Sequence, residues 1–94
     1  MHVVIRSYSG KGAAELFDLL EQREEDVKTL LTGVPGFVSY AAFRTDGGGA
    51  AVTICQDKAG TDESSRRAAE WVKANVSTAV DPPAITEGST VLHF

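Results

Sequence analysis

The sequence has 94 residues, a length that predicts one domain, residues 1–94, with a small core. Apolar residues make up 43% of it and charged residues 23%, which is typical of a folded globular protein and excludes a disordered chain. The formal net charge is -4 and the basic residues are scattered, so we expect no nucleic-acid partner. No segment reaches the roughly 18 to 20 apolar residues of a membrane span, so we expect a cytoplasmic protein without a membrane partner.

The first third of the chain predicts a strand followed by a helix. Residues 2–8 (HVVIRSY) are rich in β-branched side chains, which favours a strand. Apolar side chains then recur at helical spacing over residues 13–31, which predicts an amphipathic helix. The polar run at residues 21–26 (EQREED) interrupts this apolar stripe, so we expect a bend there. Glycine and proline at residues 33–36 end the helix.

The middle of the chain predicts a hairpin. The segment Phe37–Thr45 and residues 51–56 both favour strands, and the glycine-rich residues 46–49 (DGGG) connect them. A glycine triplet can also cradle a phosphate, but that site needs a strand followed by a helix. We therefore interpret the triplet as a turn.

The last third predicts a second helix and a final strand. Residues 61–64 (TDES) supply capping side chains for a helix start, and an apolar stripe follows. Prolines at residues 82 and 83 end this helix, and residues 84–94 predict the last strand, with a bulge or break at Gly88. Cys55 is expected to be a small buried residue on a strand, since a single cysteine can form no internal disulfide.

The predicted order is βαββαβ, an α+β ferredoxin-like sandwich: a four-stranded antiparallel sheet with two helices on one face. The strands carry apolar residues on both of their faces, whereas helices on one side call for alternation of apolar and polar residues. A second copy of the chain would cover the other face, so we expect a homodimer formed through the sheets. The alternative is a monomer with an exposed apolar face.

Residues 34–40 (VPGFVSY), which follow the first helix, and Trp71 on the second helix carry a resemblance to a known family. The chain resembles the dimeric α/β-barrel superfamily and is most similar to antibiotic-biosynthesis-monooxygenase-like (ABM-like) domains. The resemblance implies strand order 4-1-3-2, a barrel formed by two sheets, and a pocket between helices and sheet. In some of these monooxygenases an asparagine precedes the tryptophan by one turn; here that position is Arg67, a departure from the oxygenase pattern.

Four residues are candidates for a site. The implied strand order places His93 close to His2 or Val3, where we consider a proton acceptor, a haem ligand, a two-histidine metal site or a plain strand-end histidine. Arg6 is a charge on a central strand, so we expect it either to pair with Glu87 or to stabilise an anion. Tyr40 and Trp71 are interpreted either as core residues or as walls of a pocket for a flat molecule.

The favoured function is a small-molecule-binding homodimer, with cofactor-independent monooxygenation of an aromatic or apolar molecule as the first catalytic hypothesis. In this hypothesis His93 and Arg6 are catalytic, Trp71 and Tyr40 bind substrate, and neither a metal nor another cofactor is needed. One alternative is a non-enzymatic ligand-binding or interaction dimer. A second alternative is a haem-binding or haem-degrading oxygenase with His93 as the iron ligand.

Overall fold

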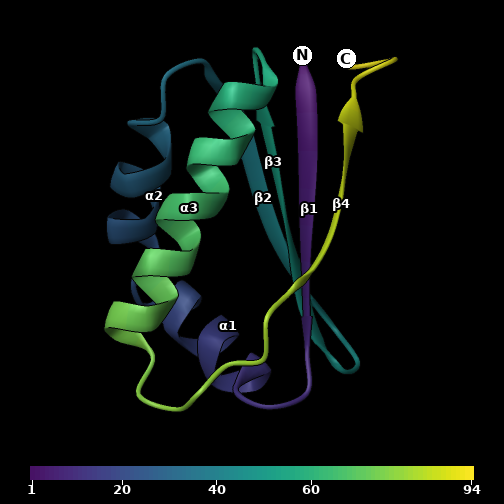
Figure 1. Cartoon of the computed structure of the whole chain (residues 1–94). Coiled ribbons are helices and arrows are strands. Elements are labelled where there is room, and N and C mark those ends of the chain that lie inside the picture. The colour runs from purple at the N-terminus through teal and green to yellow at the C-terminus, as the bar shows by residue number, and fades with distance from the viewer.

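Four strands form one antiparallel sheet, and all helices pack on one of its faces (Figure 1). The computed structural model describes all residues, 1–94. In chain order the elements are β1 (His2–Ser9), α1 (Ala13–Gln22), α2 (Glu24–Thr32), β2 (Phe37–Thr45), β3 (Gly48–Cys55), α3 (Lys58–Asn75) and β4 (Ala84–Ser89). The strand order is β2-β3-β1-β4. The predicted α+β ferredoxin-like fold and the 4-1-3-2 strand order are confirmed.

The prediction of two helices is wrong. The single helix expected over residues 13–31 is divided in the structure into α1 and α2. α1 ends and α2 begins at Arg23, whose φ of -113° and ψ of 34° are not helical. Three acidic residues, Glu24, Glu25 and Asp26, occupy the first turn of α2, where negative charge interacts favourably with the helix dipole. The polar run that predicted a bend therefore begins a new helix.

Alternate residues of β1 point toward the helices and form the centre of the core. Val4, Arg6 and Tyr8 are buried, whereas the residues between them are half-buried or exposed. The ring of Tyr8 packs edge-on against Phe17 of α1, with ring centroids 6.1 Å apart. Leu16 completes this contact, so α1 is held on the sheet by apolar side chains of the stripe that predicted it.

Two glycines allow the helices to approach the sheet closely. A Cβ on Gly49 of β3 would lie 2.5 Å from the ring of Phe17, and one on Gly60 of α3 would lie 2.7 Å from the Cβ of Cys55. Cys55 is fully buried at this contact, which confirms its predicted burial. The glycine triplet thus serves the packing of α1 as well as the turn between β2 and β3.

Helix α3 begins and ends earlier than the sequence pattern predicts. Asp57 caps its start, because the Asp57 carboxylate accepts a hydrogen bond of 3.0 Å from the backbone N–H of Gly60. The expected caps at residues 61–64 therefore lie inside the helix, where Ser64 is buried against the sheet. The helix ends at Asn75, since Val76 is already extended.

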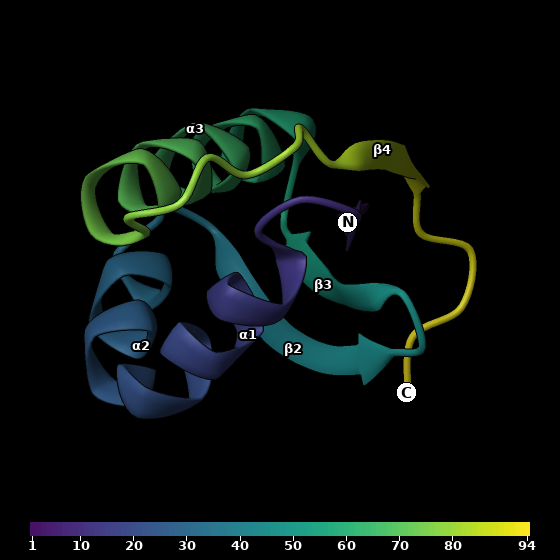
Figure 2. The ribbon, with the colours of Figure 1, turned by 90° about the horizontal axis from the view of Figure 1, so that it is seen from below.

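The last strand is shorter than predicted. β4 pairs with β1 only from Ala84, opposite Ser7, to Ser89, opposite His2. Its register continues through Gly88, so the bulge predicted there is wrong; the irregularity lies in β2, between Phe37 and Ser39. Residues 90–94 leave the sheet on the side away from the helices (Figure 2).

The second face of the sheet carries no helix (Figures 1 and 2). Ile5 and Val52 are register partners on this face and are half-buried, and Phe43 is 52% exposed. We call this surface the open face. The apolar character of both sheet faces is thus present in the structure, and one chain covers only one of them. Of the three helices, none has both the length and the hydropathy that crossing a bilayer requires.

Candidate functional site

Arg6 lies at the centre of the helix-facing side of the sheet and is only 2% exposed. It sits on β1 between Ala51 of β3 and Ile85 of β4 in the register. Because Ala51 is small, the long Arg6 side chain has room to extend between the sheet and α3. A guanidinium is charged at any physiological pH, so this position places a cation inside the core.

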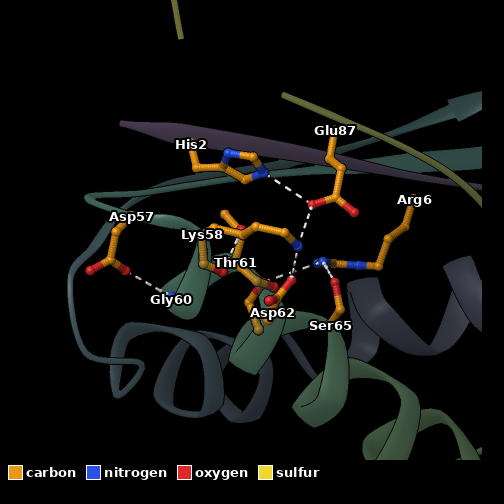
Figure 3. Close-up of polar contacts among 10 residues, drawn as sticks. His2, Arg6, Asp57, Lys58, Gly60, Thr61, Asp62, Ser65 and Glu87 are labelled. Atoms are coloured by element: carbon orange, nitrogen blue, oxygen red, sulfur yellow. Dashed lines mark hydrogen bonds and ion pairs between the residues drawn. The ribbon is translucent and has the colours of Figure 1, made fainter. Parts of the chain in front are cut away.

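Neutral hydroxyl groups hold the Arg6 side chain. Its Nη2 donates to Thr53 Oγ1 at 2.8 Å, and its Nη1 donates to Ser65 Oγ at 3.1 Å and to Ser64 Oγ at 3.4 Å. The Ser64 hydroxyl donates to the carbonyl of Thr61 at 2.7 Å, which leaves its lone pairs free to accept from Arg6. The strand β3 and the helix α3 therefore position the guanidinium from two sides. Figure 3 shows the contact with Ser65 of α3.

The expectation of an Arg6–Glu87 ion pair is wrong. Glu87 lies opposite Val4 rather than Arg6, and its carboxylate accepts from His2 at 3.0 Å and from Lys58 at 3.2 Å. The hydrogen bond from His2, followed by that from Lys58, lowers the pKa of Glu87. Figure 3 shows Glu87 engaged by this pair at the end of the sheet while Arg6 turns to α3.

Three of the four candidate residues meet at one cavity. Arg6, Tyr40 and Trp71 all line a space of about 30 Å³ between the helices and the sheet, which we call the core cavity. Apart from Arg6, its lining is apolar or aromatic. A volume of this size admits about two water molecules. A larger molecule therefore needs either a movement of the lining or a neighbouring space.

Two grooves supply that neighbouring space. The β2 groove, about 720 Å³, runs between α1, α2 and β2. It shares four lining residues with the core cavity: Leu20, Val27, Leu31 and Tyr40. The β4 groove, about 750 Å³, runs between α3, the segment 77–83 and β4, and shares Arg6, Tyr8 and Val72 with the core cavity. The core cavity thus adjoins a groove on each side, and Arg6 is reached from the β4 groove.

The two tyrosines of the cavity are protonated phenols at neutral pH. Burial raises the pKa of Tyr8 and of Tyr40, although the positive charge of Arg6 opposes the shift in both. Burial also lowers the pKa of Arg6, so the fold disfavours the charged form that Arg6 nevertheless keeps. The cavity therefore offers a buried cation and hydroxyl donors, and no group among these can accept a proton.

His93 does not join these residues. It is an exposed residue four positions beyond the end of β4, and it lines neither the core cavity nor the two grooves. The expectation that it lies beside His2 is wrong, since the register partner of His2 is Ser89. No group of three or more histidine, cysteine, aspartate or glutamate side chains is arranged to hold a metal ion.

Sequence reasoning missed Thr53, Ser64 and Ser65 as partners of Arg6. Ser64 belongs to the stretch that the sequence assigned to the helix cap. A signal was present, since Thr61, Ser64 and Ala68 are small residues at the spacing of one helix face. This spacing indicates a face that packs closely on a partner and can present hydroxyls to a buried polar group.

The comparisons with known proteins add no assignment. No protein-family model matches the sequence, and neither the curated proteins nor the solved structures contain a significant match. The chain is therefore described by what its own structure shows: a small α+β domain of ferredoxin-like architecture, with a buried arginine at a cavity between its helices and its sheet.

Proposed function

We propose that this protein binds a small, mainly apolar organic molecule between its helices and its sheet. The observation that carries the proposal is the convergence of Arg6, Tyr40 and Trp71 on the core cavity. An apolar lining with a few polar groups is the usual composition of a small-molecule site. The grooves on both sides provide the volume that the cavity lacks, so a ligand occupies the cavity together with one of them.

Cofactor-independent monooxygenation of such a molecule is the catalytic form of this proposal. In that chemistry the substrate supplies the electrons, while the protein orients it, excludes water and stabilises an anionic form. The position of Arg6 at the core cavity supports the last role, and the ABM-like resemblance supports the reaction class. Because the cavity holds no proton acceptor, the substrate has to be one that ionises readily. Monooxygenation of 1,4-naphthalenediol by O₂ gives 2-hydroxy-1,4-naphthoquinone and water, whereas simple oxidation gives 1,4-naphthoquinone and hydrogen peroxide. The rate at which the hydroxyquinone forms tests the reaction; a rate equal to that of the protein-free solution contradicts it.

Trp71 provides the test of binding. We expect Trp71→Ala to weaken binding of two bicyclic probes, 1-naphthoate and 1-naphthamide, by about tenfold or more, since the indole is a large part of the apolar wall. Binding is measured by NMR titration of ¹⁵N-labelled protein. Phe94→Ala is the matched control, because that ring is fully exposed and lies outside the cavity. Equal affinities of Trp71→Ala and wild type would place the ligand elsewhere and contradict the proposed site.

We also propose that the protein is a homodimer formed through the open face. The half-buried and exposed apolar residues of this face, such as Ile5, Val52 and Phe43, support a partner of the same kind. Native mass spectrometry or light scattering measures the assembly. We expect a dimer for wild type, a monomer for Val52→Lys, and a dimer for Ala14→Lys, which adds the same charge at an exposed position of α1. A monomeric wild type contradicts the proposal.

A further inference from the structure

Of the five arginines of this chain, the four less buried ones pair with carboxylates and the most buried one does not. This is the reverse of the usual pattern, in which a buried charge is the one that is paired. Arg23, Arg44, Arg66 and Arg67 each form an ion pair with a carboxylate. Arg6 is far more buried than any of them, yet no carboxylate lies within ion-pair distance of it. A buried charge in proteins normally has a counter-charge, because desolvation without one is costly.

The hydrogen bonds of Arg6 leave two of its donors free. A guanidinium has five N–H donors, and three of them donate to Thr53, Ser64 and Ser65. The N–H of Nε and one N–H of Nη2 have no protein acceptor. Two N–H donors on one guanidinium are the number that a carboxylate accepts in a bidentate pair.

The β4 groove leads to this guanidinium from outside. Arg6 lies in its lining together with Ser65 and Val72 of α3 and Ile85 of β4. Ile85 is the register partner of Arg6 on β1 and is 48% exposed, so no helix covers β4 at this level. Val76 and Val80 add apolar wall, and Lys73 adds a second positive charge. The one acidic side chain of the groove, Asp81, accepts from the backbone N–H of Lys11 at 3.2 Å.

We infer that the ligand of this site is an organic carboxylate with an apolar body, which enters through the β4 groove and pairs with Arg6. This inference rests on the proposed function and adds the chemical class of the ligand and its route. The carboxylate supplies the counter-charge that Arg6 lacks within the chain. The apolar body lies in the β4 groove against Ile85 and Val72, and because Val72 also lines the core cavity, it extends from there toward Trp71. A ligand with several negative charges, such as a nucleotide, fits less well because the groove has only one buried cation.

The experiment compares two probes of the same shape, 1-naphthoate and 1-naphthamide, on wild type and two variants. Affinities come from NMR titration of ¹⁵N-labelled protein, and the shifted amides locate the probe. We expect wild type to bind naphthoate about tenfold or more tighter than naphthamide, with shifts in α3 and β4, because hydrogen bonds to charged groups are strong when buried. Arg6→Met should reduce the affinity for naphthoate to that for naphthamide. Arg23→Met, which removes an exposed arginine, should change neither affinity.

Each other outcome contradicts the carboxylate inference, either alone or together with the proposed pocket. Equal binding of both probes by wild type overturns the carboxylate inference and leaves the proposed pocket standing. Naphthoate binding that Arg6→Met does not weaken also overturns the inference, since another cation then holds the probe. Binding of neither probe overturns the inference and the proposed pocket together. The comparison of the two probes on wild type does not depend on the folding of any variant.

Discussion

A buried arginine with only neutral partners should lower the stability of this fold, and Arg6→Met tests this directly. Methionine has a similar length and flexibility and fills irregular core space, so the change removes the charge with little loss of packing. Replacing buried ionic groups by apolar residues is often neutral or stabilising by about 1 to 4 kcal/mol, even where the charge was paired. Arg6 has no ion-pair partner, so its desolvation cost is not offset by a counter-charge.

The opposing terms are the three hydrogen bonds that Arg6→Met removes. The bond to Thr53 is short and fully buried, whereas the bond to Ser64 is long at 3.4 Å. Ser64 keeps its bond to the Thr61 carbonyl, so Thr53 is the one fully buried hydroxyl left without a partner, at about 1 to 3 kcal/mol. We expect the free energy of unfolding to rise by about 1 kcal/mol, which is about 4 to 8 °C in Tm for a domain of this size.

Urea denaturation followed by circular dichroism measures the effect. The double variant Arg6→Met with Thr53→Val should be more stable than Arg6→Met alone, because it also removes the unpartnered hydroxyl. Arg23→Met is the control and should change the free energy by less than about 1 kcal/mol, as exposed ion pairs contribute little. A loss of about 2 kcal/mol or more in Arg6→Met would refute the reasoning. Arg6 would then be a structural centre of the core rather than a charge kept for a ligand.

Two further predictions concern packing and pH. We expect Gly49→Ala to destabilise the fold by about 1 to 3 kcal/mol in urea denaturation, because its Cβ meets the Phe17 ring; Gly88→Ala, with nothing within 4 Å, should be neutral or slightly stabilising. Hydrogen bonds from Arg66 and then Arg67 lower the pKa of Glu63 from an ordinary 4.5 to about 2. A lowered carboxylate pKa stabilises the fold above pH 4.5, and this contribution is lost as the pH falls through about 2. Glu63→Gln should therefore be less stable than wild type at pH 7 and equal to it below about pH 2; a difference that does not vary with pH contradicts the assignment.

The sheet and its two faces could be predicted from the sequence, because the alternation of side chains in strands and the 3.6-residue period of helices depend on local neighbours. The sequence was insufficient where a single backbone angle or a long-range contact decided the outcome. The break at Arg23 interrupts a pattern that continues in period on both sides. The start of α3 depends on one capping carboxylate, that of Asp57. It was not predicted, because residues 61–64 also carry side chains that can cap a helix.

For the candidate site too, features visible in the local sequence were predicted correctly, and partners that depend on strand pairing were not. Arg6, Tyr40 and Trp71 were found because a charge on a central strand and aromatic residues on packed elements are visible in the sequence. His93 was placed wrongly because its position was counted along a strand that in fact ends at Ser89. The same overlong count put Glu87 beside Arg6. Pairing errors of this kind shift every contact along a strand, so one wrong boundary produced two wrong partners.

The register of β4 against β1 leads to a last prediction, made by moving a carboxylate along the strand. Glu87 projects on the same face of β4 as Ile85, one step of the alternation along, but it is held by His2 and Lys58. Ile85→Glu would place a carboxylate directly opposite Arg6, at a position that is 48% exposed and so loses little apolar burial.

If Arg6 has two donors free for a carboxylate, the carboxylate introduced by Ile85→Glu should take them. We expect the free energy of unfolding at pH 7 to rise by about 1 to 2 kcal/mol, and naphthoate binding to fall by about tenfold or more. Pairing with Arg6 lowers the pKa of the introduced carboxyl, so the added stability should disappear as the pH falls below about 4. The matched control is Ile85→Gln, which has the same shape without the charge. An Ile85→Glu protein that keeps the wild-type affinity for naphthoate would show that the probe does not use Arg6, because the introduced carboxylate and the ligand cannot both occupy the same two donors.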